Sequence, residues 1–172
     1  MNTPTGTVTF LFTDIESSTK LAQEFPDILQ SALDKHHSIM QKAMKSNNGF
    51  IFEIVGDAFC CAFEKAEDAV RAAVDAQLNL SKEEWNEAVI KVRIGIHSGK
   101  AEWDENRYTG YITLARTARI MSAAYGEQIL ISNDAYRLLF KMEDSKTINK
   151  NSDVNNLNLL DFELISFRDL GE

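Results

Sequence analysis

Apolar and polar residues alternate along this chain with two different periods. A period of two is typical of a strand, and apolar residues spaced three or four apart are typical of a helix. Strands are predicted over residues 7–14, 50–55, 58–63, 89–99, 127–132 and 159–172. Helices are predicted from a cap at Ser17 or Ser18 up to Pro26, and over residues 27–46, 66–80, 112–124 and 133–140.

Turn residues separate these elements and indicate how they connect. Gly56 and Asp57 stand between two strands, and glycine at the first position of a two-residue loop predicts a type II′ hairpin. Asn133 or Asp134 is placed to cap the last helix, and the polar residues 141–158 predict a surface loop. Strands that alternate with helices, plus one hairpin, indicate an α/β sandwich with helices packed against a mixed sheet.

Composition and charge limit the class of protein. The 172 residues are 44% hydrophobic and 26% charged, which is typical of one soluble globular domain. The formal net charge of −8 argues against nucleic acid and membrane surfaces as partners. The chain lacks an apolar run of the ~20 residues that a membrane span needs, and its start lacks a signal-peptide pattern. Cys60 and Cys61 point to opposite faces of one predicted strand, so no disulfide is expected, and a cytoplasmic location is predicted.

Two aspartates lie at the ends of apolar strands, Asp14 in FLFTDIESST and Asp57 in VGDAF. A carboxylate this close to buried backbone is costly unless it is paired, hydrogen-bonded or bound to a metal. If the two strands are neighbours, both carboxylates lie at one edge of the sheet, which is the arrangement of a two-metal phosphoryl-transfer site. The alternative is that Asp14 caps the next helix and Asp57 is only a turn residue.

Four segments together carry a family resemblance: GTVTFLFTDIESSTKL, VGDAFCCAF, VRIGIHSG and ARIMSAAYGEQILIS. In this order and spacing the sequence resembles the class III adenylate/guanylate cyclase catalytic domain over essentially the whole chain. The resemblance implies an α/β (α+β) fold with a ferredoxin-like βαββαβ core, a mixed but mainly antiparallel sheet and flanking helices. It also implies a head-to-tail homodimer with shared active sites that converts a nucleoside triphosphate, GTP or ATP, into its 3′,5′-cyclic monophosphate and pyrophosphate.

The resemblance assigns roles by position. Asp14 and Asp57 match the family's metal carboxylates, with the carbonyl of Ile15 as a further ligand, so two Mg²⁺ or Mn²⁺ ions per site are implied. Arg119 matches the arginine that stabilises charge on the α-phosphate, and Arg116 on the same helix is a competing assignment. A turn that offers backbone N–H groups and hydroxyls can hold a triphosphate. Substrate contacts are therefore implied for Ile15, Glu16, Ser17, Ser18, Thr19 and Tyr108.

Glu53, four residues before Asp57, is implied to read the base. Guanylate cyclases of this family usually carry glutamate at this position and adenylate cyclases lysine. A carboxylate only accepts hydrogen bonds, and guanine offers adjacent N1–H and N2–H donors, whereas adenine presents an acceptor at N1. GTP is therefore favoured, although Arg107 and Tyr108, near the second base-reading position, give no support for either base.

Two departures from the family pattern leave a second function open. Ala115 stands where the family usually has an asparagine that orients the ribose, and a phosphate-binding lysine is expected only beyond Glu172. We therefore expect that residues 1–172 are one catalytic domain, the N-terminal part of a longer protein, cut before its last strand. The alternative is a catalytically weakened homology domain that binds nucleotide or dimerises to regulate attached domains.

Three histidines are predicted to be structural. His97, at a strand end, is interpreted as a packing residue with one hydrogen bond. His36 and His37 are adjacent on the long helix and cannot share one face, and Leu33, Met40 and Met44 form an apolar stripe that predicts a core face.

Overall fold

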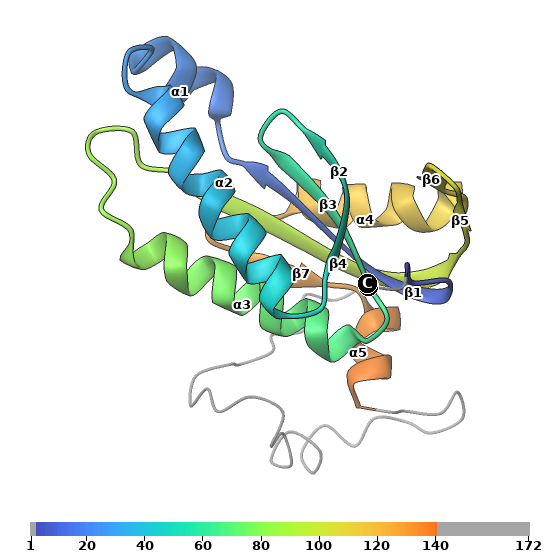
Figure 1. Cartoon of the computed structure of the whole chain (residues 1–172). Helices are drawn as coiled ribbons and strands as arrows, with labels where there is room; N and C mark the ends of the chain where they lie inside the picture. Colours follow the sequence, from blue (N-terminus) through green and yellow to red (C-terminus); the bar gives the residue numbers. More distant parts are fainter. Residues whose placement is uncertain (1–2, 141–172) are drawn as a thin grey trace. The chain divides into compact units, whose positions relative to one another are not determined.

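The computed structural model describes residues 3–140 and places five strands in one sheet, in the order β2-β3-β1-β4-β7 (Figure 1). The strands of this sheet are β1 (Gly6–Ile15), β2 (Phe50–Val55), β3 (Ala58–Phe63), β4 (Val92–Ala101) and β7 (Ile129–Ile131). The helices are α1 (Ser18–Glu24), α2 (Leu29–Ser46), α3 (Ala66–Lys82), α4 (Tyr111–Ala123) and α5 (Asn133–Leu139). A separate two-stranded sheet consists of β5 (Trp103–Asp104) and β6 (Arg107–Tyr108).

The sheet is mixed and mainly antiparallel, as the sequence predicts. Strand β1 lies between β3 and β4 and is antiparallel to both, and β2 is antiparallel to β3. Among the strands that the structure describes, only β4 and β7 pair in parallel, and α4 lies in the connection between them. The order β4-β1-β3-β2, with helices between β1 and β2 and between β3 and β4, is the ferredoxin-like arrangement.

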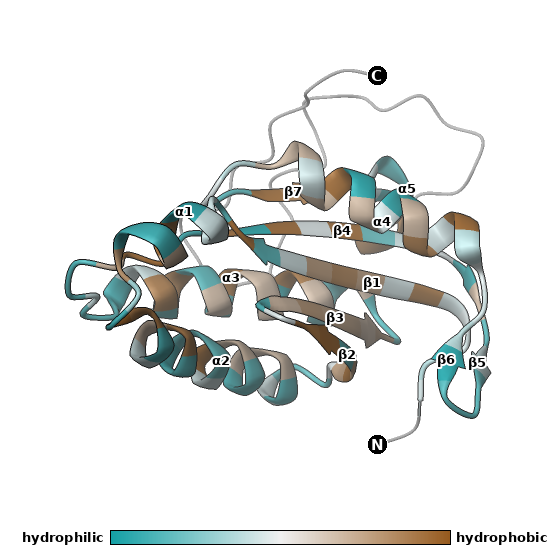
Figure 2. Cartoon of the chain, turned by 90° about the horizontal axis from the view of Figure 1, so that it is seen from above, coloured by the Kyte–Doolittle hydropathy of each residue, from teal (hydrophilic) through white to brown (hydrophobic). Residues whose placement is uncertain are grey.

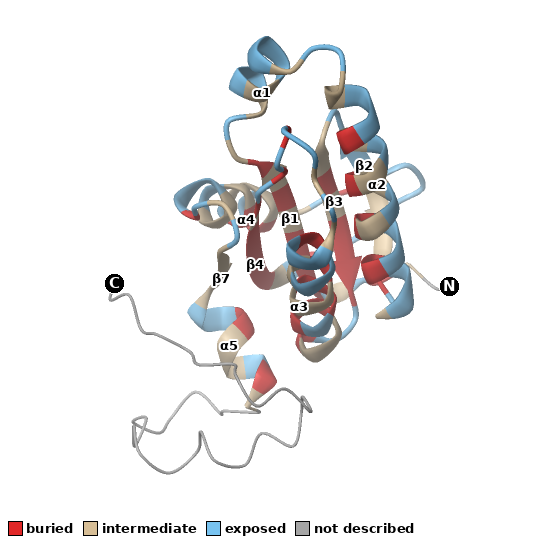
Figure 3. Cartoon of the chain, turned by 90° about the vertical axis from the view of Figure 1, so that its left-hand side faces the viewer, coloured by how far each residue is buried: buried red, intermediate tan, exposed pale blue. Residues whose placement is uncertain are grey.

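Helices cover both faces of the sheet. Figures 1 and 2 show α2 and α3 on one face and α4 on the other, and α4 contacts β4 and β1. Figure 2 shows hydrophobic residues along the strands between these layers. The burial of residues agrees with these layers (Figure 3). The central strands are buried, whereas every residue of α1 is half-buried or exposed.

A glycine sets the distance between α4 and the sheet. A Cβ added to Gly95 in β4 would lie 2.3 Å from the backbone nitrogen of Met121. The helix backbone therefore rests directly on the strand at this point, and α4 is held close to the sheet edge that carries Asp14.

The hairpin is confirmed and one helix cap is corrected. The φ of Gly56 is 62°, and the φ of Asp57 is not positive, which fits a type II′ turn.

The predicted cap of the last helix, Asn133 or Asp134, is wrong, because these two residues are the first and second residues of α5 itself. Ser132 is the cap, and its hydroxyl accepts a hydrogen bond from the N–H of Ala135 at 3.2 Å.

The predicted cap of the first helix is confirmed in position, because Ser17 is the N-cap residue of α1. Within residues 3–140 its side chain makes no capping hydrogen bond, and its backbone is left-handed with a φ of 58°. The predicted loop over residues 141–158 and the predicted last strand over residues 159–172 lie outside the described residues.

Within residues 3–140, no helix has the length and apolar character that crossing a membrane requires.

Candidate active site

Asp14 and Asp57 lie at the same edge of the sheet. The β1–β3 ladder runs from Thr9 opposite Phe63 to Phe12 opposite Cys60. Asp14 follows Phe12 and Asp57 precedes Cys60, so antiparallel pairing brings both to the end of the ladder. The neighbouring strands that the sequence analysis required are therefore present.

Asp14 is paired with an arginine that the sequence analysis did not select. Arg93 stands directly opposite Asp14 in the β1–β4 register and donates to its Oδ2 from Nε at 3.0 Å and from Nη2 at 2.5 Å. Arg93 also donates from Nη1 to the carbonyl of Ser122, at the end of α4, at 3.4 Å. Only the strand register could have identified this pair, since the two residues are 79 positions apart.

The Asp57 carboxylate fits a cation site. Its Oδ2 is buried and has no hydrogen-bond partner within the described part of the chain. A buried carboxylate oxygen without a partner is unfavourable, and a cation would supply the missing interaction. Residues 3–140 hold no cluster of three or more His, Cys, Asp or Glu side chains that could bind a metal. A metal held here would depend on the two aspartates, backbone carbonyls and the substrate.

The segment that follows Asp14 is anchored mainly through its backbone and Glu16. Ile15 is buried, and the N–H of Glu16 donates to the carbonyl of Lys91 at 2.9 Å. The Glu16 carboxylate accepts a hydrogen bond from the N–H of Gly126 at 3.0 Å. Glu16 is therefore engaged with the loop after α4, while the side chains of Ser17 and Thr19 are exposed and Ser18 is half-buried.

Glu53 lies on β2, on the same hairpin as Asp57. Its side chain is exposed, and its partner in the β2–β3 register is Cys60. Burial, together with the nearby Glu53 carboxylate, raises the pKa of the Cys60 thiol to about 11. Cys60 and Cys61 are both free thiols, so the expected absence of a disulfide between them is confirmed.

Tyr108 lies in the core of the domain. Its ring is 6% exposed and packs edge-on against Phe10 and Phe52, with centroid distances of 4.9 Å in each case. Its hydroxyl donates to the carbonyl of Pro4 at 2.8 Å, and burial raises the pKa of the phenol. Because both the ring and the hydroxyl are engaged inside the protein, we leave Tyr108 out of the proposed site.

Arg116 and Arg119 are both exposed on α4, so burial does not separate the two assignments. Arg116 lies near His97 and contributes to lowering the pKa of that histidine, after the larger effect of burial. Ala115 is half-buried on the same helix. Arg119 and Ser122 lie on the same helix, and the carbonyl of Ser122 accepts a hydrogen bond from Arg93. Helix α4 therefore connects Arg119 to the edge of the sheet that carries Asp14.

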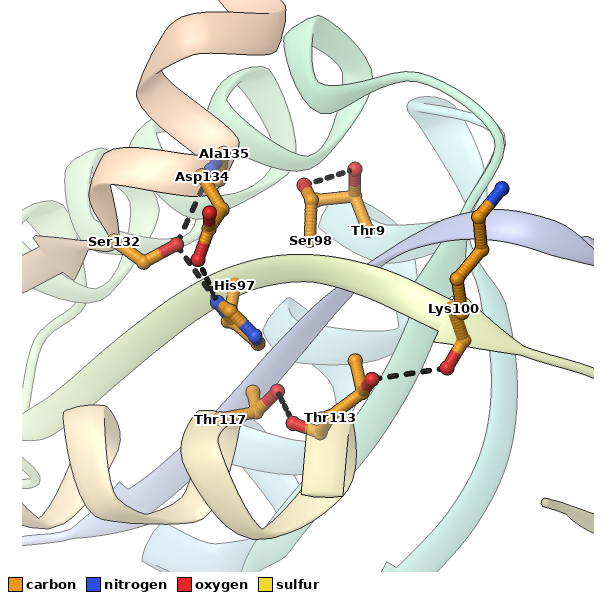
Figure 4. A network of polar contacts seen from close by, with 9 residues as sticks. All are labelled: Thr9, His97, Ser98, Lys100, Thr113, Thr117, Ser132, Asp134 and Ala135. Carbon is orange, nitrogen blue, oxygen red and sulfur yellow. Dashed lines mark hydrogen bonds and ion pairs between the residues drawn. The ribbon is translucent and has the colours of Figure 1, made fainter. Parts of the chain in front are cut away.

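The interpretation of His97 as a packing residue is confirmed. It is 2% exposed, and its Nδ1 lies 2.9 Å from the Ser132 hydroxyl and 3.7 Å from a carboxylate oxygen of Asp134 (Figure 4). Figure 4 also shows Thr117 of α4, whose hydroxyl donates to the carbonyl of Thr113 at 2.9 Å. His97 therefore joins β4 to the first turn of α5.

The two histidines of α2 pack on the β2–β3 hairpin. His36 is fully buried, and His37 contacts the turn at Gly56 with its Nε2 3.3 Å from the Gly56 carbonyl oxygen. Met40 and Met44 are fully buried, which confirms the core face of α2.

Comparisons with known proteins assign this chain to a family. The model of the adenylate and guanylate cyclase catalytic domain matches residues 1–158, and the chain belongs to this family. An uncharacterised protein of Mycobacterium tuberculosis is 35% identical over 131 residues, which are 75% of this chain and 44% of that protein. The adenylate cyclase of Schizosaccharomyces pombe is 28% identical over 196 residues, covering 98% of this chain and 12% of that enzyme.

Solved structures give the same assignment. An adenylate cyclase structure from Trypanosoma brucei, in its monomeric state, is 28% identical in sequence and superposes with a TM-score of 0.71. The matched region is 79% of this chain and 77% of the chain of the Trypanosoma structure. The guanylyl cyclase domain of the RhoGC fusion protein from Blastocladiella emersonii shares the fold, with a TM-score of 0.69 at 24% identity. The matched region is 78% of this chain and 85% of the chain of that structure. The chain spans less than half the length of the curated relatives described above.

Proposed function

We propose that this chain is the catalytic domain of a class III nucleotidyl cyclase that converts a nucleoside triphosphate into its 3′,5′-cyclic monophosphate and pyrophosphate for intracellular signalling. The observation that carries the proposal is the position of Asp14 and Asp57 at one sheet edge, with a buried oxygen on Asp57 that has no hydrogen-bond partner among residues 3–140. Membership of the cyclase family supports the same chemistry.

Asp14, Asp57 and the carbonyl of Ile15 would hold two Mg²⁺ or Mn²⁺ ions, since these cations prefer oxygen ligands. Ions bound there would lower the pKa of the ribose 3′-hydroxyl and would neutralise the triphosphate and the leaving pyrophosphate. Arg93 balances the charge of Asp14 before a cation arrives, because the guanidinium contacts its Oδ2. The backbone of residues 15–19 lies next to Asp14, where it would contact the triphosphate.

In the reaction the 3′-oxygen attacks the α-phosphorus, and the bond between the α-phosphorus and the oxygen that bridges to the β-phosphate breaks. Arg119 would contact the oxygens of the α-phosphate, where charge increases, and its planar group of donors suits that task. The exposed position of Arg119 fits a residue that acts across a subunit interface.

A homodimer with shared active sites is part of the proposal. Large apolar side chains are exposed on α4 and on the loop after it, with Tyr111 83%, Ile112 68% and Tyr125 74% exposed. Contiguous exposed apolar surface is typical of a protein–protein contact, and these side chains, at the two ends of α4, are proposed to contribute to one. A dimer formed through this surface would bring Arg119 of one protomer toward the Asp14 and Asp57 of the other.

GTP is the proposed substrate because Glu53 is an exposed acceptor on the hairpin that carries Asp57. Guanine matches a carboxylate at its N1–H and N2–H edge. The deciding experiment incubates the protein with Mn²⁺ and equimolar GTP and ATP, and resolves the products by mass and retention time. Cyclic GMP in excess is expected, and cyclic AMP in excess would leave a cyclase but refute the role of Glu53.

The variant Asp57→Asn tests the site, because it removes the negative charge and keeps the shape of the side chain. We expect no cyclic nucleotide from Asp57→Asn, while Asp34→Asn, an exposed carboxylate of α2, retains full activity. Equal activity of wild type and Asp57→Asn would refute the metal site.

A second candidate function is a nucleotide-binding regulatory domain with little turnover, and Ala115 on α4 favours it. Calorimetry that shows metal-dependent binding of GTP without product would support this function. The variant Ala115→Asn would then gain turnover, because it restores an amide that can orient the ribose.

A further inference from the structure

The two proposed metal carboxylates lie beyond the last residue pair of the β1–β3 ladder. That pair is Phe12 with Cys60. Asp14 and Asp57 are therefore not in directly paired positions of the ladder, and other contacts must determine how far apart they stand.

The first of these contacts is a side-chain hydrogen bond from β1. The hydroxyl oxygen of Thr13 accepts a hydrogen bond from the N–H of Phe59 at 3.1 Å. Thr13 is adjacent to Asp14, Phe59 is two residues after Asp57, and both are fully buried. The bond therefore links the backbone next to one carboxylate with the backbone next to the other.

The second contact comes from α2. The Nε2 of His37 lies 3.3 Å from the carbonyl oxygen of Gly56, and the carbonyl can only accept, so His37 is the donor. The ring of Phe59 also packs against the imidazoles of His36 and His37, with centroid distances of 5.8 Å and 5.5 Å. Helix α2 thereby contacts the turn on the residue before Asp57 and on the residue two after it.

We propose that Thr13 and His37 are positioning residues, which hold the Gly56–Asp57 turn against β1 and α2 and so set the separation of the Asp14 and Asp57 carboxylates. This inference rests on the proposed metal site. Neither residue is among the proposed metal ligands, and each acts through the turn. Removal of partners that orient metal ligands typically weakens metal binding by roughly 10- to 100-fold.

A merely structural role makes a different prediction, and the chain contains a matched control for it. Thr9, on the same strand, is 1% exposed, and its hydroxyl is 2.8 Å from the hydroxyl of Ser98, away from the turn (Figure 4). The variants Thr9→Val and Thr13→Val each remove one buried hydroxyl from β1. Both should lower stability, but only Thr13→Val should weaken metal binding.

The test measures binding of Mn²⁺ alone, from the electron paramagnetic resonance signal of the free ion, and hydrogen exchange of the amides of residues 56–59. Thr13→Val is expected to bind Mn²⁺ roughly tenfold more weakly and to exchange faster in the turn, and Thr13→Ser should restore both. His37→Phe keeps a ring against Phe59 but loses the donor, so it should act in the same direction, and His37→Gln should recover part of the loss. Urea unfolding measures the stability of each variant.

Wild-type Mn²⁺ affinity and wild-type exchange in Thr13→Val and His37→Phe would overturn the inference. If Thr13→Val does not fold, the two His37 variants decide alone. If the wild-type protein binds no Mn²⁺, either alone or with GTP, the proposed metal site fails. Hydrogen exchange would then still decide whether the two bonds hold the turn, so the two failures are distinguishable.

Discussion

Replacement of Gly95 by alanine should separate α4 from the sheet. The added Cβ would lie 2.3 Å from the nitrogen and 2.6 Å from the Cα of Met121. Ordinary contacts begin near 3.4 Å, so α4 would have to move away by about 1 Å. Both obstructing atoms belong to the helix backbone, which cannot rotate away as a side chain can.

The cost follows from this geometry. Overpacking of a dense core typically costs about 1–3 kcal/mol, and a backbone obstruction places Gly95→Ala at the upper end, about 3 kcal/mol. For a domain of this size, that loss corresponds to a fall in Tm of about 6–12 °C. Arg119 lies two residues before Met121, so the same displacement should lower kcat by about 100-fold if Arg119 contacts the α-phosphate.

Thermal unfolding followed by circular dichroism measures the first effect, and cyclic-nucleotide production measures the second. Gly99→Ala is the matched comparison, because its Cβ would meet side-chain atoms of Thr113, 2.6 Å from Oγ1 and 2.8 Å from Cγ2, and no atom of the helix backbone. Thr113 can shift at the cost of the hydrogen bond from its Oγ1 to the Lys100 carbonyl, without movement of the whole helix. The loss in Tm should therefore be smaller for Gly99→Ala than for Gly95→Ala. Equal losses, or a wild-type Tm for Gly95→Ala, would refute the close contact between α4 and β4.

Three further predictions concern single side chains. Burial lowers the pKa of His36 from 6.5 to about 4, so the unfolded chain takes up a proton before the folded one does. Stability should therefore fall by about 3 kcal/mol from pH 6.5 to pH 4, and His36→Leu should flatten this slope in urea unfolding across that range. Ser132→Ala removes the cap of α5 and the partner of His97, and should lower stability by about 1 kcal/mol or more in the same assay. Glu53→Lys should shift product formation from cyclic GMP toward cyclic AMP, and an unchanged ratio would refute base reading by Glu53.

Much of the fold could be predicted from the sequence because its signals are local. Two-residue alternation identified β1, and the Gly56 turn identified the hairpin between β2 and β3. The cap of α5 was missed because Ser132 ends the predicted strand, while Asn133 and Asp134 are equally good capping residues by type. Only the backbone conformation distinguishes Ser132, which is extended, from the helical residues after it.

The site could be predicted less completely than the fold. Asp14, Asp57 and Glu53 were selected because charged residues in apolar segments are conspicuous, and the fold places all three on β1 or on the β2–β3 hairpin. Tyr108 was selected because it lies just before Gly110, where the resemblance puts the second base-reading position. Position along the chain does not tell which way the ring of Tyr108 points. Its aromatic neighbours belong to distant segments, so its place in the core could not be read from the local sequence.

The residues that were missed share one physical property, which is that each acts through a partner far away in the sequence. Arg93 pairs with Asp14 across 79 positions, Thr13 with Phe59 across 46, and Glu16 with Gly126 across 110. All three pairs lie at the edge of the sheet that carries the two aspartates. Arg93 joins β4 to β1, Phe59 joins the hairpin to β1, and Gly126 joins the loop after α4 to the residue that follows β1. The geometry of the aspartates therefore depends on contacts that a motif does not contain, so a chain can keep Asp14, Asp57 and Arg119 and still differ in metal affinity. For this reason the proposed activity is best tested together with variants of the supporting contacts, not of the motif residues alone.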